Sequence, residues 1–483
     1  MMAENSNSRV KYFAKNVGIL GVSNFASKIL VFLLVPLYTS VLSTSEYGIY
    51  DMIYSMIQLV FPLLTLNITE GVMRFSLDKT KDIREVGEIG LKYLFFSMVL
   101  VGGFLILSHE NGWIEAIQGL EGYIFIYVLS YFLNQFLIQF AKGQERVKDM
   151  GVCGIIGTFM LLGGNLLFLL VFKWGLEGFL LANILCQGGS VLYLAVRLHL
   201  WQYIRVNNWY DLRSLQKEML IYSMPLIFTT VGWWVNNALD KYAVTFIVGV
   251  SATGILSVAY KIPTILSTLQ SIFIQAWQIS AIKEYEVGDS SKFYGIMFSY
   301  LNFMVCCAAI VLIMLTRPIA SIMYSKNFYA AWQYVPFLIL AAVFNSASGF
   351  LGPILSAAKN SVSMAKSAIY GSLVNLVMNI ALIYAMGVQG ATIATAISSY
   401  AIYIVRKWAV GEQICVPAYW KIYMNWVFVI VMAILEIYTG SYIAECVVIV
   451  VIAVLNYKEI MLLATKMKEA GSEFVVKIRD KAE

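Results

Sequence analysis

Four ionisable residues, Lys28, Asp240, Lys241 and Lys261, lie inside long apolar stretches of this sequence. A charge near the centre of a bilayer costs ~2.5 kcal/mol or more, so such residues normally face a wet interior or an oppositely charged partner. Three lysines against one aspartate predict a cationic cavity between helices that would bind an anionic head group. Asp240 would then balance part of this positive charge or carry a coupling ion.

Two other interpretations of these charges stay open. Adjacent residues on a helix do not face each other, so Asp240 would not pair with Lys241 and would instead meet Lys261 or Lys28. An ion pair of this kind could serve helix packing alone. A long lysine side chain can also extend to the membrane surface, which would place its charge outside any cavity.

Asparagines lie one helical turn before three of these charges, and two more lie one turn apart late in the chain. They are Asn24, Asn236, Asn237, Asn375 and Asn379. Amides at such positions either contact the hydroxyls of a sugar or bond neighbouring helices together. The second role is the commoner one in membranes, and both remain possible here.

The composition places the chain in a membrane. Of the 483 residues, 60% are apolar and 13% are charged, whereas soluble domains contain ~25% charged residues. We therefore predict an all-α polytopic membrane protein with about fourteen transmembrane helices. The polar start followed by an apolar stretch predicts a signal anchor rather than a cleaved signal peptide. Because the six cysteines lack metal-ligand spacing, we expect neither a metal nor a cofactor.

Apolar runs bounded by charged residues, glycine or proline define the predicted helices, each long enough for a span of ~20 residues. The ranges are 17–41, 49–70, 90–108, 122–141, 151–172, 177–197, 219–248, 253–279, 294–316, 332–354, 366–386, 390–408, 420–438 and 441–463. The last four are the least clearly separated, so twelve or thirteen helices remain possible.

The basic residues predict the orientation of these helices. With the N-terminus in the cytoplasm, most of the 34 lysines and arginines lie on the cytoplasmic side, and the opposite connections contain only Lys173, Arg317 and Lys326. The positive-inside bias therefore places both termini in the cytoplasm. The net charge of +6 reflects these connections, and we expect no nucleic-acid partner. No outer connection is long enough for a folded catalytic domain.

A weak repeat indicates two halves. The stretch SEYGI at 45–49 matches SATGI at 251–255 in Ser, Gly and Ile, and Tyr54 matches Tyr260 at the same offset. Six predicted helices, an even number, separate the two stretches, so the halves would be a parallel repeat about an axis along the membrane normal. We predict a six-helix N-terminal lobe over 1–205, a six-helix C-terminal lobe over 206–410, and two further helices with a tail over 411–483.

Nothing in the sequence has the pattern of an enzyme active site. It contains no phosphate-binding P-loop, no HExxH motif and no nucleophile elbow. We therefore predict that the protein is not an enzyme. Energy for any transport would come from an ion gradient, from the membrane potential or from the gradient of the substrate.

Three groups of residues resemble a known family in their order and spacing. LLVPLY at 33–38 leads to LSTSEYG at 42–48, and Pro225 precedes the Asp240-Lys241 pair, two glycines and Tyr260-Lys261. NLVMN at 375–379 precedes GVQGA at 387–391. Over nearly the whole chain this pattern resembles Wzx-type polysaccharide flippases. They form the O-antigen and capsule branch of the multidrug/oligosaccharidyl-lipid/polysaccharide exporter superfamily.

The resemblance implies two lobes around a cationic cavity and, as substrate, an undecaprenyl-diphosphate-linked repeat unit. The unit would move from the inner to the outer leaflet of the bacterial cytoplasmic membrane by alternating access. Lys28, Lys241 and Lys261 would attract the diphosphate, and Asp240 is the acidic candidate for proton or sodium coupling. Partners would be membrane lipids and the polymerase and glycosyltransferases of the same pathway. Lipid II flippases match less well, because their arginine-acid pattern in the first helix is replaced here by Lys28 alone.

Two rival functions remain. A cation-coupled multidrug exporter of the same superfamily would need acidic residues for cationic substrates, whereas intramembrane lysines outnumber carboxylates here. A membrane-embedded polysaccharide polymerase or glycosyltransferase would need a substantial outer loop with catalytic side chains, which the sequence lacks.

Overall fold

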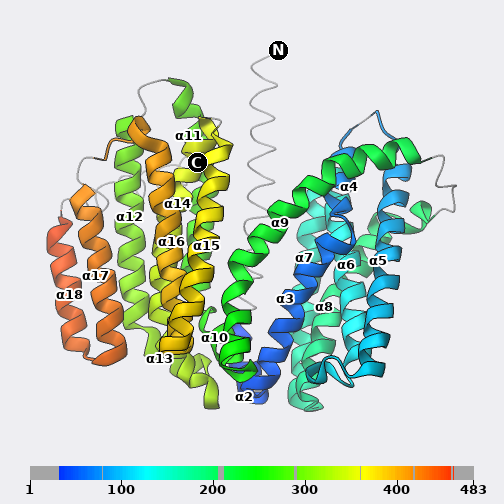
Figure 1. Cartoon of the computed structure of the whole chain (residues 1–483), viewed down its shortest axis with the longest axis horizontal. Coiled ribbons are helices and arrows are strands. Elements are labelled where there is room, and N and C mark those ends of the chain that lie inside the picture. Colours follow the sequence, from blue (N-terminus) through cyan, green and yellow to red (C-terminus); the bar gives the residue numbers. More distant parts are fainter. Residues whose placement is uncertain are drawn as a thin grey trace, which may run out of the picture. The chain divides into compact units, whose positions relative to one another are not determined.

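The computed structural model describes residues 32–78, 80–204, 212–287, 291–358, 360–416, 419–457 and 461, and these are helical apart from short turns. The helices form two compact units. The first unit extends to Val258 and includes Ser321–Ala330, and the second comprises Ala259–Ala320 and the chain from Ala331 onward. Colours from blue to green follow the first unit along the chain in Figure 1, and later colours follow most of the second.

The first unit is built from long apolar helices joined by short turns. Its elements are α2 (Val35–Val41), α3 (Thr44–Leu64), α4 (Ile68–Ser76), α5 (Ile83–Asn111), η1 (Glu115–Ile117), α6 (Glu121–Gly143), α7 (Val147–Asn165), the π-helical η2 (Leu166–Val171), α8 (Gly175–Arg197), η3 (Leu200–Tyr203), α9 (Arg213–Ile247) and α10 (Val250–Ala259). A capping box starts α3, because the Ser43 hydroxyl accepts from the Glu46 amide while the Glu46 carboxylate accepts from the Ser43 amide. Helix α6 packs against α4, α5 and α8, and buries Phe132, Phe136 and Phe140.

The second unit surrounds one almost wholly buried helix. Its elements are α11 (Pro263–Val287), α12 (Ser291–Met314), α13 (Thr316–Met323, shared with the first unit), η4 (Lys326–Tyr334, also shared), α14 (Val335–Ala357), α15 (Ser361–Met386), α16 (Val388–Val410), η5 (Gly411–Gln413), α17 (Tyr419–Tyr438) and α18 (Tyr442–Leu455). Helix α14 lies against α11, α12, α16 and α17. The Trp277 and Phe350 rings stack 4.2 Å apart in this core.

Large apolar side chains cover the outside of both units. Phe95, Leu192 and Ile369, for example, each expose 60% or more of their surface, which water would penalise but lipid would not. Within the described ranges ten helices are long and apolar enough to cross a membrane, or eleven if the bent pair α10–α11 is one span. The protein is therefore an all-α, multi-pass membrane protein.

Each predicted helix from 49–70 onward overlaps a helix of the structure, whereas the first, 17–41, lies mostly outside the described residues. The total of fourteen stays a prediction, because the 35-residue α9 and the 14-residue α18 are not among the ten spans.

Two predicted helices are wrong as single segments. The range 49–70 breaks after Leu64, where Asn67 takes a left-handed conformation (φ 52°) before α4 begins. The range 253–279 bends by 49° between α10 and α11. Pro263 begins α11, and a proline has no N–H to continue the hydrogen bonds of the preceding helix.

The border between the two compact units falls at Val258, later than the predicted lobe boundary at residue 205. The difference arises because α9 packs against α3 and α4. The three-part lobe division, which concerns a repeat in the membrane, stays a prediction.

Candidate functional site

Three helices of the first unit meet at one buried carboxylate. Asp51 on α3 is only 7% exposed. Its Oδ2 lies 2.7 Å from the Nζ of Lys241 on α9 and accepts a 2.8 Å hydrogen bond from the Ser257 hydroxyl on α10. A charge buried away from water needs such partners, because unpaired it costs several kcal/mol. The Asp51–Lys241–Ser257 cluster therefore ties α3, α9 and α10 together.

The two repeated sequence stretches touch each other beside this cluster. A Cβ on Gly48 would collide with the carbonyl oxygen of Val250, and a Cβ on Gly254 would collide with that of Thr44. The offset that relates SEYGI to SATGI also relates Gly48 to Gly254 and Thr44 to Val250, so it converts each contact into the other. The same offset relates Asp51 to Ser257, which are hydrogen-bonded. The contact is thus self-complementary, as at a two-fold axis, and only glycine lets the backbones approach this closely.

Polar and aromatic contacts hold α3 in place around the crossing. On one side, Trp234 of α9 donates to the Ser55 carbonyl (2.7 Å), and the Tyr242 hydroxyl donates to the Met52 carbonyl (3.3 Å). On another side, the Tyr50 ring packs against Phe179 of α8 at 4.5 Å. The backbone of α3 is therefore anchored on both faces next to Asp51.

The structure places the predicted cationic residues in different surroundings. Lys241 is neutralised by Asp51, so its charge is not free for a ligand. Asp240, the predicted coupling residue, is buried. Lys261 lies at the bend between α10 and α11, is half-buried, and forms no ion pair with any residue that the structure describes. Lys28 lies outside the described residues.

The predicted asparagines divide in the same way. Asn24 lies outside the described residues, and so do the side chains of Asn236 and Asn237 on α9. Asn375 and Asn379 are both buried. The Asn375 amide donates to Ser398 on α16 at 3.2 Å, and Asn379 donates to the Asn375 side chain at 2.9 Å. These contacts bond α15 to α16, and a role in sugar binding stays a prediction.

Sequence reasoning missed two charged residues. Asp51 lies near the start of its predicted helix, 49–70, and was not singled out, although the offset of the repeat relates it to Ser257. Arg406 on α16 donates to the Ser367 hydroxyl (3.0 Å) and to the Ser348 carbonyl (2.8 Å), and forms no ion pair within the described ranges. Its signal was an arginine, followed directly by Lys407, at the end of an apolar run.

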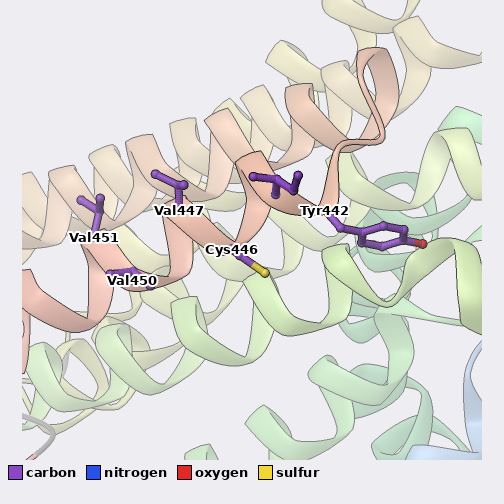
Figure 2. Close-up of a pocket in the computed structure, with 6 residues that line it drawn as sticks. Tyr442, Cys446, Val447, Val450 and Val451 are labelled. Carbon is purple, nitrogen blue, oxygen red and sulfur yellow. The ribbon is translucent and has the colours of Figure 1, made fainter.

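A shallow groove of about 460 Å³ on α18 is apolar, unlike the charged clusters described above. Figure 2 shows its lining, which includes Tyr442, Cys446 and Val450. None of the six lining side chains is charged. The groove suits acyl chains and not a diphosphate, so we do not assign the anion site to it.

Comparison with known proteins identifies the family. Residues 13–278, more than half of the chain, match the model of the Polysaccharide biosynthesis protein family, and the chain belongs to this family. It is 22% identical over 315 residues to the probable low-salt glycan biosynthesis flippase Agl15 of Haloferax volcanii. That match spans 64% of each of the two chains, so just under two thirds of the relative's length. The predicted resemblance is thereby confirmed at the level of the family.

Solved structures share the fold at low sequence identity. The Lipid II flippase MurJ in an inward closed conformation superposes with a TM-score of 0.69 at 14% identity, over 92% of this chain and 98% of that one. An inward-facing multidrug resistance MATE family transporter of the MOP superfamily gives a TM-score of 0.63 at 13% identity, over 82% and 95%. The chain therefore shares its fold with these two proteins.

Proposed function

We propose that this protein is a flippase that moves a polyprenyl-diphosphate-linked oligosaccharide across a membrane. The observation that carries the proposal is the membership of a polysaccharide biosynthesis family in a chain that has a transporter fold. Transport by alternating access needs no covalent chemistry. In this proposal the two compact units are the parts that move.

The substrate chemistry follows from the charges in the apolar segments. Lys28 and Lys261 supply positive charge that a diphosphate would neutralise, and Arg406 is a third candidate. Lys241 acts indirectly, since Asp51 already holds it. In this proposal Asp240 carries the coupling ion, H+ or Na+, and the amides of Asn24, Asn236, Asn237, Asn375 and Asn379 contact the sugars.

The finer assignments belong to the same proposal. The carrier would be undecaprenyl diphosphate, moved from the inner to the outer leaflet of a bacterial cytoplasmic membrane with both termini in the cytoplasm. The glycan would be an O-antigen or capsule repeat unit, delivered by glycosyltransferases and passed to a polymerase. The basic residues on the predicted cytoplasmic side support the orientation.

Reconstitution tests the proposal. The full chain is placed in vesicles that contain a polyprenyl-diphosphate oligosaccharide with a fluorescent sugar, and an impermeant quencher reports which leaflet the sugar occupies. We expect the protein to accelerate exchange between leaflets. Lys28→Gln and Lys261→Gln should each slow exchange by on the order of tenfold, since a hydrogen bond to a charged group is worth ~1.5–3 kcal/mol.

Lys142→Gln is the matched control, because Lys142 is an exposed lysine at the end of α6. Exchange no faster than in empty vesicles would reject the flippase assignment. Normal exchange in both lysine variants would retain the flippase and reject the diphosphate contacts. The MATE likeness keeps a multidrug exporter as the second candidate, and ion-driven efflux of a cationic dye from the same vesicles would favour it.

A further inference from the structure

A second buried acidic cluster lies at the end of α17 in the second unit. Glu436 near the end of α17 and Glu445 in the first turn of α18 are both 0% exposed. The two side chains lie within hydrogen-bonding reach of each other, across a turn at Gly440 with φ +56°. Figure 1 shows α17 and α18 side by side, and they pack together.

One arginine contacts Glu436 twice. The Arg317 Nε lies 3.2 Å from Oε1 of Glu436, and its Nη2 donates to the Glu436 main-chain carbonyl at 2.5 Å. The guanidinium is held from the other side by the Trp332 ring, 4.2 Å from its centroid. This geometry fixes Arg317 beside Glu436.

The carboxyl oxygens of Glu436 and Glu445 lack hydrogen-bond donors unless one of the two groups carries a proton. None of the four side-chain oxygens of Glu436 and Glu445 accepts a hydrogen bond from the part of the chain that the structure describes. Two ionised carboxylates and one guanidinium would leave a net negative charge in an apolar environment, at a cost of several kcal/mol. A single proton shared by the two carboxyl groups supplies the missing donor and brings the net charge to zero.

Among the described helices that pack against α17, no other charge replaces this proton. Helices α12, α14 and α18 pack against α17. In α12 the only charged residue is Lys292, at the far end, and α14 has none. The second charge of α17 is Lys421, fifteen positions from Glu436, or ~22 Å along the helix. The nearby Tyr438, Tyr442 and Cys446 are exposed. The described residues contain no group of three or more His, Cys, Asp or Glu able to hold a metal ion.

We propose that Glu436 and Glu445 form a binding site for one proton that fastens α18 to α17. With the proton bound, the carboxyl pair is neutral towards Arg317 and the helices stay packed. Loss of the proton leaves two like charges in contact, which weakens the α17–α18 packing. The site uses neither the predicted cationic cavity nor Asp240, so it stands apart from the proposed flippase function.

Infrared titration of the full chain in lipid nanodiscs tests the proton site directly. With the carboxyl groups of glutamate labelled by carbon-13, we expect the carbonyl band of a protonated acid at neutral pH, lost in one step as the pH is raised to about 9. Glu436→Gln and Glu445→Gln should each remove this band, because one carboxylate and the nearby Arg317 guanidinium then balance in charge without a proton. Glu412→Gln, at an exposed position of the same unit, should leave it unchanged.

Three results would overturn the proposal. They are a wild-type protein without a titrating acid band, a band that survives in either glutamine variant, and a band that disappears at constant pH when sodium replaces choline. The last would indicate an alkali-ion site. The titration and the sodium exchange use the wild-type chain, so the test does not depend on folding of the variants. Because no transport is measured, failure of the flippase assignment would leave this result unaffected.

Discussion

The two buried acidic clusters of this protein differ in how completely their charges are paired. In the first unit, the Asp51 carboxylate forms an ion pair with the Lys241 ammonium and accepts a hydrogen bond from the Ser257 hydroxyl, each from another helix. In the second unit, Arg317 pairs with Glu436, and the Glu445 carboxyl group lies beside that of Glu436. A complete pair needs no ligand and fixes helices in one arrangement. An incomplete pair needs a proton, so its packing can respond to pH.

The largest expected effect comes from removing the glycine that lets the first cluster form. Gly254→Val places a side chain against the Thr44 carbonyl, where backbone and not a flexible side chain blocks it. We expect a loss of about 3 kcal/mol or more in the free energy of unfolding, or failure to fold. Gly103→Val is the control, because a Cβ at Gly103 in α5 meets nothing within 4 Å. Equal stability of both variants in detergent would show that the crossing is not tight.

Breaking the complete pair should come next. Asp51→Asn leaves the Lys241 charge without its carboxylate and should cost ~3 kcal/mol, whereas Ser257→Ala removes one hydrogen bond and should cost ~1 kcal/mol. Adding Lys241→Met to Asp51→Asn should restore part of the loss, since no buried charge remains. Chemical unfolding measures all three, with exposed Glu110→Gln as the control. No recovery in the double variant would mean that the pair does more than balance charge.

The incomplete pair should reveal itself by the pH dependence of stability. If the folded state holds a proton that the unfolded state has released, stability falls as pH rises, with a slope of up to ~1.4 kcal/mol per pH unit. Glu445→Gln keeps a hydrogen-bond donor without the second charge, so its stability should change less between about pH 6 and pH 9. Parallel curves for wild type and Glu445→Gln would place the proton elsewhere.

The smallest effect on stability is expected at the neutral hydrogen bond between Asn375 and Ser398, which serves as a reference for the charged contacts. A double-mutant cycle of Asn375→Ala and Ser398→Ala should give a coupling of ~0.6 kcal/mol, the usual size for a hydrogen bond between membrane helices. If Asn375→Ala slowed leaflet exchange while this coupling was absent, the amide would be a sugar contact instead.

Much of the helical layout could be predicted, and the two errors have local causes. The ranges 294–316 and 420–438 agree closely with α12 and α17, because long apolar runs bounded by polar residues have few other solutions in lipid. The break at Asn67 was missed, since apolar residues continue on both sides of it, whereas Pro263 inside the predicted range 253–279 is a signal for the bend between α10 and α11.

The candidate site was predicted less well than the helices. Lys241 was identified, but its partner Asp51 lies 190 residues earlier and no local pattern joins them. The carboxyl pair at Glu436 and Glu445 was missed, although Glu436 is the only acidic residue in the predicted range 420–438 and Glu445 is one of two in 441–463. Its arginine comes from α13, more than a hundred residues away in the sequence.

Composition and apolar run length by themselves determined that this chain crosses a membrane many times as helices, because every backbone group in lipid must bond within its own segment. They also determined that a few charges must be buried there. Which charges meet was decided only by tertiary structure. Pairing depends on helix faces and crossing points, and at Gly48 and Gly254 on the absence of a single carbon atom.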